Sequence, residues 1–149
     1  MPGKPPFKLK GIDHVVLRVA DLDRSLRFYR DALGCTMERE QKQLGLYQLR
    51  AGDTLIDLVP VDEKLGRQGG GAPGRDGRNM DHFAIAIDPF DEDELRSHLG
   101  AHGIDVPQAA MRYGAEGEGP SVYVTDPDGN TVELKAPARK EKGSDPRGV

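Results

Sequence analysis

Hydrophobic and polar positions alternate in the first half of the chain in a way that predicts a strand, a helix and three more strands. Residues 11–20 ("GIDHVVLRVA") alternate as a half-buried strand does. Residues 21–34 place apolar side chains at helical spacing, between a capping aspartate and a terminating glycine. Short apolar stretches within residues 35–60, separated by turn residues, predict the other strands.

The second half of the chain predicts the same order of elements. Residues 80–88 ("MDHFAIAID") are typical of a buried strand, and Asp91 with Glu94 fits a capping box that opens a helix ending at Gly103. Three strands are expected within residues 105–136. Each half is therefore predicted to be a βαβββ module, and the fold class to be α+β.

Three segments differ from these modules in composition. Residues 1–8 and 138–149 are rich in charge, proline and glycine, and we expect both to be disordered. Residues 64–79 are rich in glycine and predict a flexible linker. The modules are thus predicted to span residues 9–63 and 80–137.

Chemically useful side chains recur at matching places of the two modules. His14 and His82 both follow an aspartate and open the first strand of their half, 68 positions apart. Asp57 and Glu133 both lie in the last strand of their half, 76 positions apart. This repetition indicates a duplicated module that carries one histidine and one carboxylate in each copy.

A tyrosine also recurs, because Tyr47 and Tyr123 are again 76 positions apart. Tyr123 alternates with valines and shares one strand face with Ser121. That pattern predicts a polar face on the strand that precedes Glu133.

The strand at residues 80–88 is predicted to have two unlike faces. Its bulky side chains alternate with His82, Ala84 and Ala86, and the two alanines leave room beside the histidine. If the sheets face one another across a pseudo-twofold axis, the two histidines and two carboxylates meet. Two imidazoles with one or two carboxylates suit a divalent transition metal that keeps room for a substrate.

Composition excludes several classes of partner. The 149 residues carry a formal charge of −4 without a basic stripe, so no nucleic-acid partner is expected. No apolar run is long enough to span a membrane, and no signal peptide is visible. Cys35 is the only cysteine, which excludes an internal disulfide. A cytoplasmic location and a small-molecule substrate are the expectation.

Three stretches carry a resemblance to a known family: "DHVVLRVADLDRSLRFYRDALG", "DHFAIAID" and, most specifically, "YVTDPDGNTVEL". Over residues 9–137 the chain resembles the vicinal oxygen chelate superfamily, which includes glyoxalase I, extradiol dioxygenases, fosfomycin-modifying thiol transferases and bleomycin-binding proteins. The resemblance implies two βαβββ modules that form a cup-shaped half-barrel around one divalent metal ion (Ni, Co, Zn, Mn or Fe).

The family's metal positions fall on His14, His82 and Glu133, with Asp57 where glyoxalases usually carry a glutamate. By this resemblance the chain is a metal-dependent glyoxalase-like lyase or isomerase that works through an enediolate. Glu133 would be the general base, with Asp57 as its partner, and Tyr123 would donate a hydrogen bond to developing oxyanion charge.

Arg18 and Arg78 lie four residues after His14 and four before His82, spacings similar to those of the arginines that hold glutathione in glyoxalase I. Ser121 and Tyr123 match a Ser-x-Tyr pair of the fosfomycin enzymes. These four are the predicted substrate-binding residues.

Three other activities of the same superfamily stay open. They are a non-haem Fe(II) ring-cleaving dioxygenase, a thiol transferase that uses glutathione or another thiol, and a ligand-sequestering resistance protein. The resemblance also implies a homodimer, in which the modules pair within one chain or between two chains.

Overall fold

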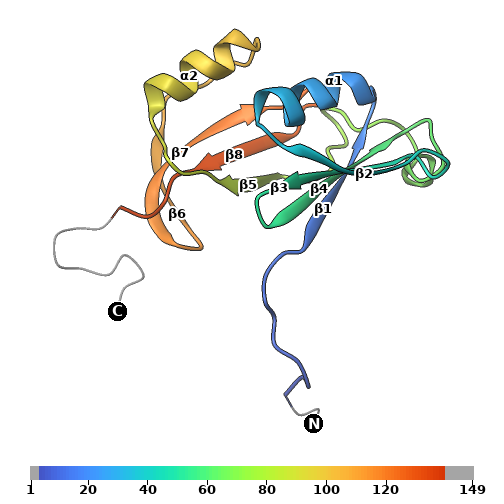
Figure 1. The fold of residues 1–149 in the computed structure, drawn as a ribbon, viewed down its shortest axis with the longest axis horizontal. Coiled ribbons are helices and arrows are strands. Elements are labelled where there is room, and N and C mark those ends of the chain that lie inside the picture. Colours follow the sequence, from blue (N-terminus) through green and yellow to red (C-terminus); the bar gives the residue numbers. More distant parts are fainter. Residues whose placement is uncertain (1–3, 140–149) are drawn as a thin grey trace.

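The first half of the protein folds into one four-stranded sheet. In the computed structural model, which describes residues 4–139, its strand order is β1-β4-β3-β2 (Figure 1). β1 runs parallel to β4, and the other neighbours are antiparallel. The strands are β1 (His14–Val19), β2 (Thr36–Gln41), β3 (Leu46–Ala51) and β4 (Thr54–Pro60).

The second half repeats that sheet with the order β5-β8-β7-β6. Its strands are β5 (His82–Ala86), β6 (Ala110–Gly114), β7 (Gly117–Thr125) and β8 (Thr131–Lys135). β5 is again parallel to the last strand. The predicted fold class, α+β with two βαβββ modules that form a cup, is confirmed. Within residues 4–139 no helix is long and apolar enough to cross a membrane.

Each module contributes one helix, and both helices lie on the same side of the sheets (Figure 1). α1 (Leu22–Leu26) continues as a π-helical stretch, η1 (Arg27–Ala32), and α2 spans Glu92–Ala101. Asp21 accepts a hydrogen bond from the Arg24 backbone, and Asp91 accepts one from the Glu94 backbone, so both predicted caps form.

One hydrophobic core joins the helix-covered faces of both sheets. Its fully buried members come from β1, η1 and α2 as well as from β3, β4, β7 and β8: Leu17, Val19, Tyr29, Leu49, Leu58, Leu99, Val122, Val124, Val132 and Leu134. Because the modules bury these faces together, the opposite face of each sheet is free for polar side chains. We call these the open faces.

The turn at residues 126–130 docks the second module onto the first helix. The buried Asp126 carboxylate accepts hydrogen bonds from the Tyr29 hydroxyl, the Asn130 side chain and the backbone N–H groups of Asp128 and Asn130. Asp128 in turn accepts from the Ala20 backbone. Burial, followed by the Asp126 charge, raises the pKa of Tyr29, so this hydroxyl stays protonated and donates.

The glycine-rich segment at residues 64–79 is tied to β1 at its start. The Arg18 guanidinium donates to the carbonyls of Gly66, Gly70 and Gly71 around η2 (Gly66–Gly69). A Cβ at Gly69 would lie 2.2 Å from Arg18 Nε and would displace that side chain, whereas one at Gly66 would lie 1.8 Å from the Pro60 carbonyl oxygen, where only glycine fits. The part of the predicted linker nearest the first module is therefore anchored to β1.

The predicted terminal segments lie partly outside the described residues. Residues 4–8 contain no helix or strand and are exposed. At the other end, the Arg139 backbone donates to the Glu118 carbonyl at 2.7 Å, so the start of the predicted tail pairs with β7. The remainder, residues 140–149, is outside the described chain.

Replacing Tyr29 by phenylalanine removes only the hydroxyl that links the modules. Because the variant leaves the buried Asp126 carboxylate with one donor fewer, we expect the free energy of unfolding to fall by about 1–3 kcal/mol. Urea denaturation measures this change. The matched control is Tyr113→Phe, whose ring is 73% exposed, and its stability should be unchanged. Equal stability of the two variants would contradict the role given to the Tyr29–Asp126 bond.

Candidate functional site

His82 and Glu133 form a close pair on the open face of the second sheet. Ala84 pairs with Glu133 across β5 and β8, so its small side chain lies in the same row as the carboxylate. The distance from His82 Nε2 to Glu133 Oε1 is 3.5 Å. Glu133 is 7% exposed, whereas the histidine is partly open to solvent. A nearly buried carboxylate and an accessible imidazole nitrogen thus point to one place.

Asp81 fixes the orientation of the His82 ring. Its Oδ2 lies 2.6 Å from His82 Nδ1, and this hydrogen bond lowers the pKa of Asp81. A carboxylate at Nδ1 places the proton there and leaves the lone pair on Nε2, the nitrogen that faces Glu133. Metal-binding histidines are typically held in this way.

The first module repeats this arrangement with His14. Asp13 Oδ2 lies 2.7 Å from His14 Nδ1, and the hydrogen bond raises the pKa of His14. On the same open face Asp57 is only 3% exposed and accepts from Gln48 Nε2 at 3.1 Å. Its other oxygen, Oδ1, has no hydrogen-bond partner. Burial raises the pKa of Asp57.

The two pairs do not meet within one chain. Among residues 4–139 no three histidine, cysteine, aspartate or glutamate side chains come together as a set that could hold a metal ion. The donor chemistry nevertheless fits a divalent metal, because each module offers an imidazole oriented by a carboxylate and a nearly buried acidic side chain, and Asp57 Oδ1 has no hydrogen-bond partner. The assignment of His14, His82, Glu133 and Asp57 as ligands stays a prediction.

The modules differ by one residue in the register of their last hairpin. Tyr123 pairs with Glu133 and shares its face, whereas Tyr47 pairs with Leu58 and points into the core. The position opposite Asp57 belongs to Gln48. The equal spacing of the tyrosines along the chain therefore does not make them equivalent in space. Two residues join β3 to β4, but five join β7 to β8, and the sequence spacing does not reveal that difference.

Arg112 is a residue of the open face that the sequence analysis missed. Its Nη1 donates to the Ser121 carbonyl and, at 2.8 Å, to the Ser121 hydroxyl, and its guanidinium lies 4.1 Å from the centre of the Tyr123 ring. The Tyr123 ring meets the His82 ring edge to face at 5.5 Å. Arg112 thus holds both members of the predicted Ser-x-Tyr pair beside the His82–Glu133 pair. The alternation of side chains within residues 110–114 could have indicated that Arg112 lies on the open face.

Neither predicted glutathione-binding arginine lies at the pair. The Arg18 guanidinium donates its hydrogen bonds to the three glycine carbonyls described above. Arg78 is exposed in the glycine-rich segment, where its charge makes a small contribution to the lowered pKa of Asp81. A substrate-binding role for either residue stays a prediction.

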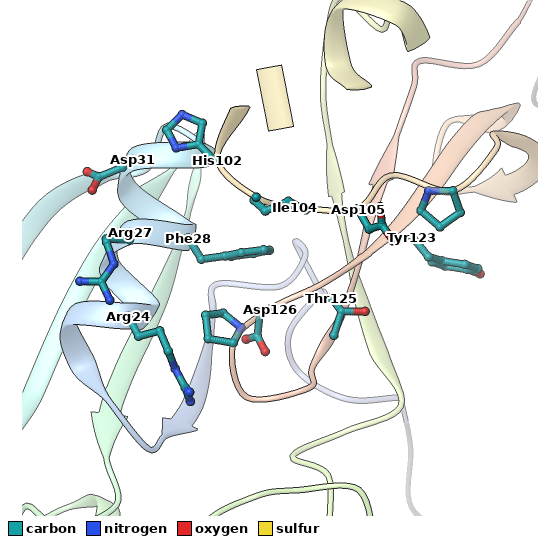
Figure 2. A pocket seen from close by; sticks show the side chains of 13 residues that line it. Arg24, Arg27, Phe28, Asp31, His102, Ile104, Asp105, Tyr123, Thr125 and Asp126 are labelled. Atoms are coloured by element: carbon teal, nitrogen blue, oxygen red, sulfur yellow. The ribbon is translucent and has the colours of Figure 1, made fainter. Parts of the chain in front are cut away.

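A separate cleft of about 690 Å³ opens on the helix-covered side, between the first helix and β7. Figure 2 shows Arg24, Arg27 and Phe28 on its helical wall, and the Tyr123 ring pointing away from that wall. Neither His82 nor Glu133 lines this cleft, which is therefore separate from the cavity at that pair.

Two sheets of identical strand order, each with a helix on one face and a histidine and a carboxylate on the other, define a duplicated βαβββ protein. The family model described as Glyoxalase/Bleomycin resistance protein/Dioxygenase superfamily matches residues 11–134. The chain belongs to this superfamily.

Individual relatives span several activities. The chain is 31% identical to Virulence protein STM3117 of Salmonella typhimurium over 83% of this chain and 81% of that protein. It is 30% identical to glutathione transferase FosA of Serratia marcescens, covering 85% and 80% of the two chains. The structure of lactoylglutathione lyase from Agrobacterium tumefaciens superposes with a TM-score of 0.62 at 27% identity, covering 87% and 95%.

Asp57 is expected to destabilise the metal-free protein. Because its pKa is raised on folding, the folded state holds the proton more tightly than the unfolded chain, and stability falls as pH rises from about 3.8 through the folded-state pKa. We expect Asp57→Asn to raise the free energy of unfolding of metal-free protein by about 1 kcal/mol at pH 7. This gain should vanish below about pH 3.8.

Thermal unfolding of both proteins across pH 3–8 in the presence of a chelator measures this difference. Asp53→Asn, in the exposed turn between β3 and β4, is the control and should show no gain. A less stable Asp57→Asn protein at pH 7 would show that the carboxylate is satisfied without metal.

Proposed function

We propose that the protein is a metal-dependent enzyme of glyoxalase type, a lyase or isomerase that acts on a small substrate with two adjacent oxygen atoms. The observation that carries this proposal is the 3.5 Å approach of His82 Nε2 to the nearly buried Glu133 Oε1. Ala84, Ala86, His82 and Glu133 line one cavity of about 300 Å³, which suits a small molecule.

His82 and Glu133, with His14 and Asp57 from the other open face, would hold the divalent metal. When bound, the metal supplies Lewis-acid polarisation of the substrate oxygens. A metal at this place would also neutralise the Glu133 carboxylate, which is costly to bury alone.

Glu133 is assigned the proton transfer. Its carboxylate removes a proton from the carbon beside the substrate carbonyl and returns it to the adjacent carbon, through an enediolate, so the residue ends as it began. Its small neighbour Ala84 leaves space for the substrate carbon on that face. Tyr123, edge-on to the His82 ring, is placed to donate its hydroxyl to the oxygen on which negative charge develops.

A second copy of the chain would complete the site. In one chain the His14–Asp57 side and the His82–Glu133 side belong to different sheets, whose helix-covered faces are already buried against each other. The open face of the first module also exposes Val16 beside His14, and Ile12 is 74% exposed just before it. A homodimer that pairs the first module of one copy with the second module of the other would bring all four residues together and cover these apolar side chains.

Thiol transfer is the second candidate. It is supported by the 30% identity to a glutathione transferase and by Ser121 and Tyr123, which adjoin the His82–Glu133 pair. The two candidates differ in the fate of the thiol, because a lyase or isomerase rearranges a thiol adduct whereas a transferase leaves a new carbon–sulfur bond in the product.

Metal analysis and an isomerase assay test the proposal. The purified protein should contain about one divalent metal per chain and isomerise the hemithioacetal of methylglyoxal and glutathione. His82→Ala and Glu133→Gln should lose both metal and activity, and Asp81→Asn should weaken metal binding about 10–100-fold because it frees the ring. His102→Ala, outside the His82–Glu133 cavity, is the control and should retain both.

Three results would contradict the lyase assignment. Glutathione addition to fosfomycin would make the protein a thiol transferase, and iron with oxygen uptake on a catechol would make it a dioxygenase. Metal-free protein whose ligand binding survives His82→Ala would make it a binding module.

Complementation tests the shared site. His14→Ala and His82→Ala should each be inactive alone. In a mixed dimer one of the two sites keeps both histidines, so an equal mixture that exchanges freely should regain about a quarter of the wild-type activity. An inactive mixture, with exchange shown by differently tagged chains, would place the site within single chains.

A further inference from the structure

The open face of the second module carries two cationic side chains to which the proposed function gives no role. Lys135 lies two residues after Glu133 on the same face of β8 and pairs with Ala86 and Ser121. Arg112 lies on β6 opposite Gly119, in the next row of that face. Lys135, like His82 and Glu133, lines the cavity of about 300 Å³.

Lys135 is nearly buried and forms no ion pair with Glu133, the carboxylate two residues away on the same face. It is 8% exposed, and its Nζ donates one hydrogen bond, to the Ala136 carbonyl at 3.1 Å. No ion pair joins it to any carboxylate of residues 4–139. An ammonium group has three N–H donors, and burying it unpaired is costly. The position therefore indicates an anion that this single chain does not itself provide.

Two glycines on the neighbouring strands lie against this lysine. A Cβ at Gly119 would lie 2.5 Å from the Pro137 carbonyl oxygen and 3.0 Å from Lys135 Nζ, and one at Gly114 would lie 3.3 Å from Lys135 Cε. Both glycines lie on strands of the same sheet, so the lysine stem runs across a groove that side chains at these positions would narrow. Lys135 is therefore enclosed by its own sheet and is only 8% exposed, with one hydrogen bond from Nζ.

Arg112 adds positive charge beside the same row. Its Nη1 is used by Ser121, whereas its other N–H groups have no partner within the described chain. Two carboxylates that line the same cavity oppose this effect: Glu116, on an exposed turn and open to water, and the nearly buried Glu133, which faces His82. The nearly buried ammonium therefore acts more strongly on a bound group than the solvated carboxylate does.

We propose that Lys135, flanked by Arg112, binds an anionic group of the substrate, a carboxylate or a phosphonate, while oxygens of the same molecule face His82 and Glu133. This inference rests on the proposed site and narrows its substrate class to small acids. Two residues along a strand span about 7 Å, so the anionic group lies a few bonds from the reacting carbon.

Binding of three matched small molecules to metal-free protein tests the proposal. Glycolate and hydroxymethylphosphonate carry the two anionic groups, and glycolamide is the neutral analogue. We expect the anions to bind at least about tenfold more tightly than glycolamide, with shifts of the Gly114 and Gly119 amides in NMR spectra. Lys135→Met should abolish this preference, and Lys135→Arg should keep part of it.

Lys64→Met removes a lysine that is exposed outside the cavity and should change nothing. Circular dichroism reports whether Lys135→Met is folded; if it is not, Lys135→Gln and Arg112→Met take its place. Equal binding of glycolate and glycolamide, or unchanged anion binding by the lysine variants, would overturn the proposal. So would a wild-type dimer that binds no anion while a monomeric variant does, because the second copy would then supply the anion.

The metal-free measurement separates this inference from the proposed function. If the protein takes up no metal but binds anions through Lys135, the anion site is supported and the proposed metal-dependent enzyme is rejected. Metal uptake and isomerase activity, with no lysine-dependent preference for anions over glycolamide, would support the enzyme and reject the anion site. In active protein, Lys135→Met should raise KM for an acid far more than for its neutral ester, a difference that a merely structural lysine would not produce.

Discussion

The Asp126 carboxylate is the contact on which the relation of the two modules depends. It closes the turn at residues 126–130 through backbone N–H groups and Asn130, and it binds the Tyr29 hydroxyl of the other module. A buried carboxylate is costly unless it is fully hydrogen-bonded, and here its partners come from both modules. The Asp126 carboxylate therefore has all of its hydrogen-bond donors only when the first helix is docked, and this couples folding of the turn to assembly of the shared core.

Docking through the helix-covered faces determines where chemistry is possible. Because the core uses one face of each sheet, the histidines, acids and cations are gathered on the other. The unpartnered Asp57 oxygen and the unpaired Lys135 lie on these open faces. Both are polar groups that cost stability in an isolated chain, and such costs are typical of positions kept for binding rather than for folding.

The periodicity of the sequence predicted much of the fold, but it predicted the candidate site only in part. Caps at Asp21 and Asp91 and the two faces of β5 are local properties, so the alternation of residues predicted them correctly. Whether four ligands meet depends on how two sheets are placed in space, which no local pattern encodes. Arg112 was missed because its importance comes from contacts with Ser121 and Tyr123 across a strand pairing.

The short turn between β3 and β4 shows how a duplicated module can diverge without changing its side chains. With two residues there and five in the corresponding turn of the other copy, the pairing moves by one position, and Tyr47 faces the core while Tyr123 meets the His82 ring. A change in which residues form the turn thus exchanges the side chains offered by a whole strand face in one step. Because ten positions separate Tyr47 from Asp57 and Tyr123 from Glu133 alike, this exchange needed no insertion or deletion, only a different division of the same residues between turn and strand.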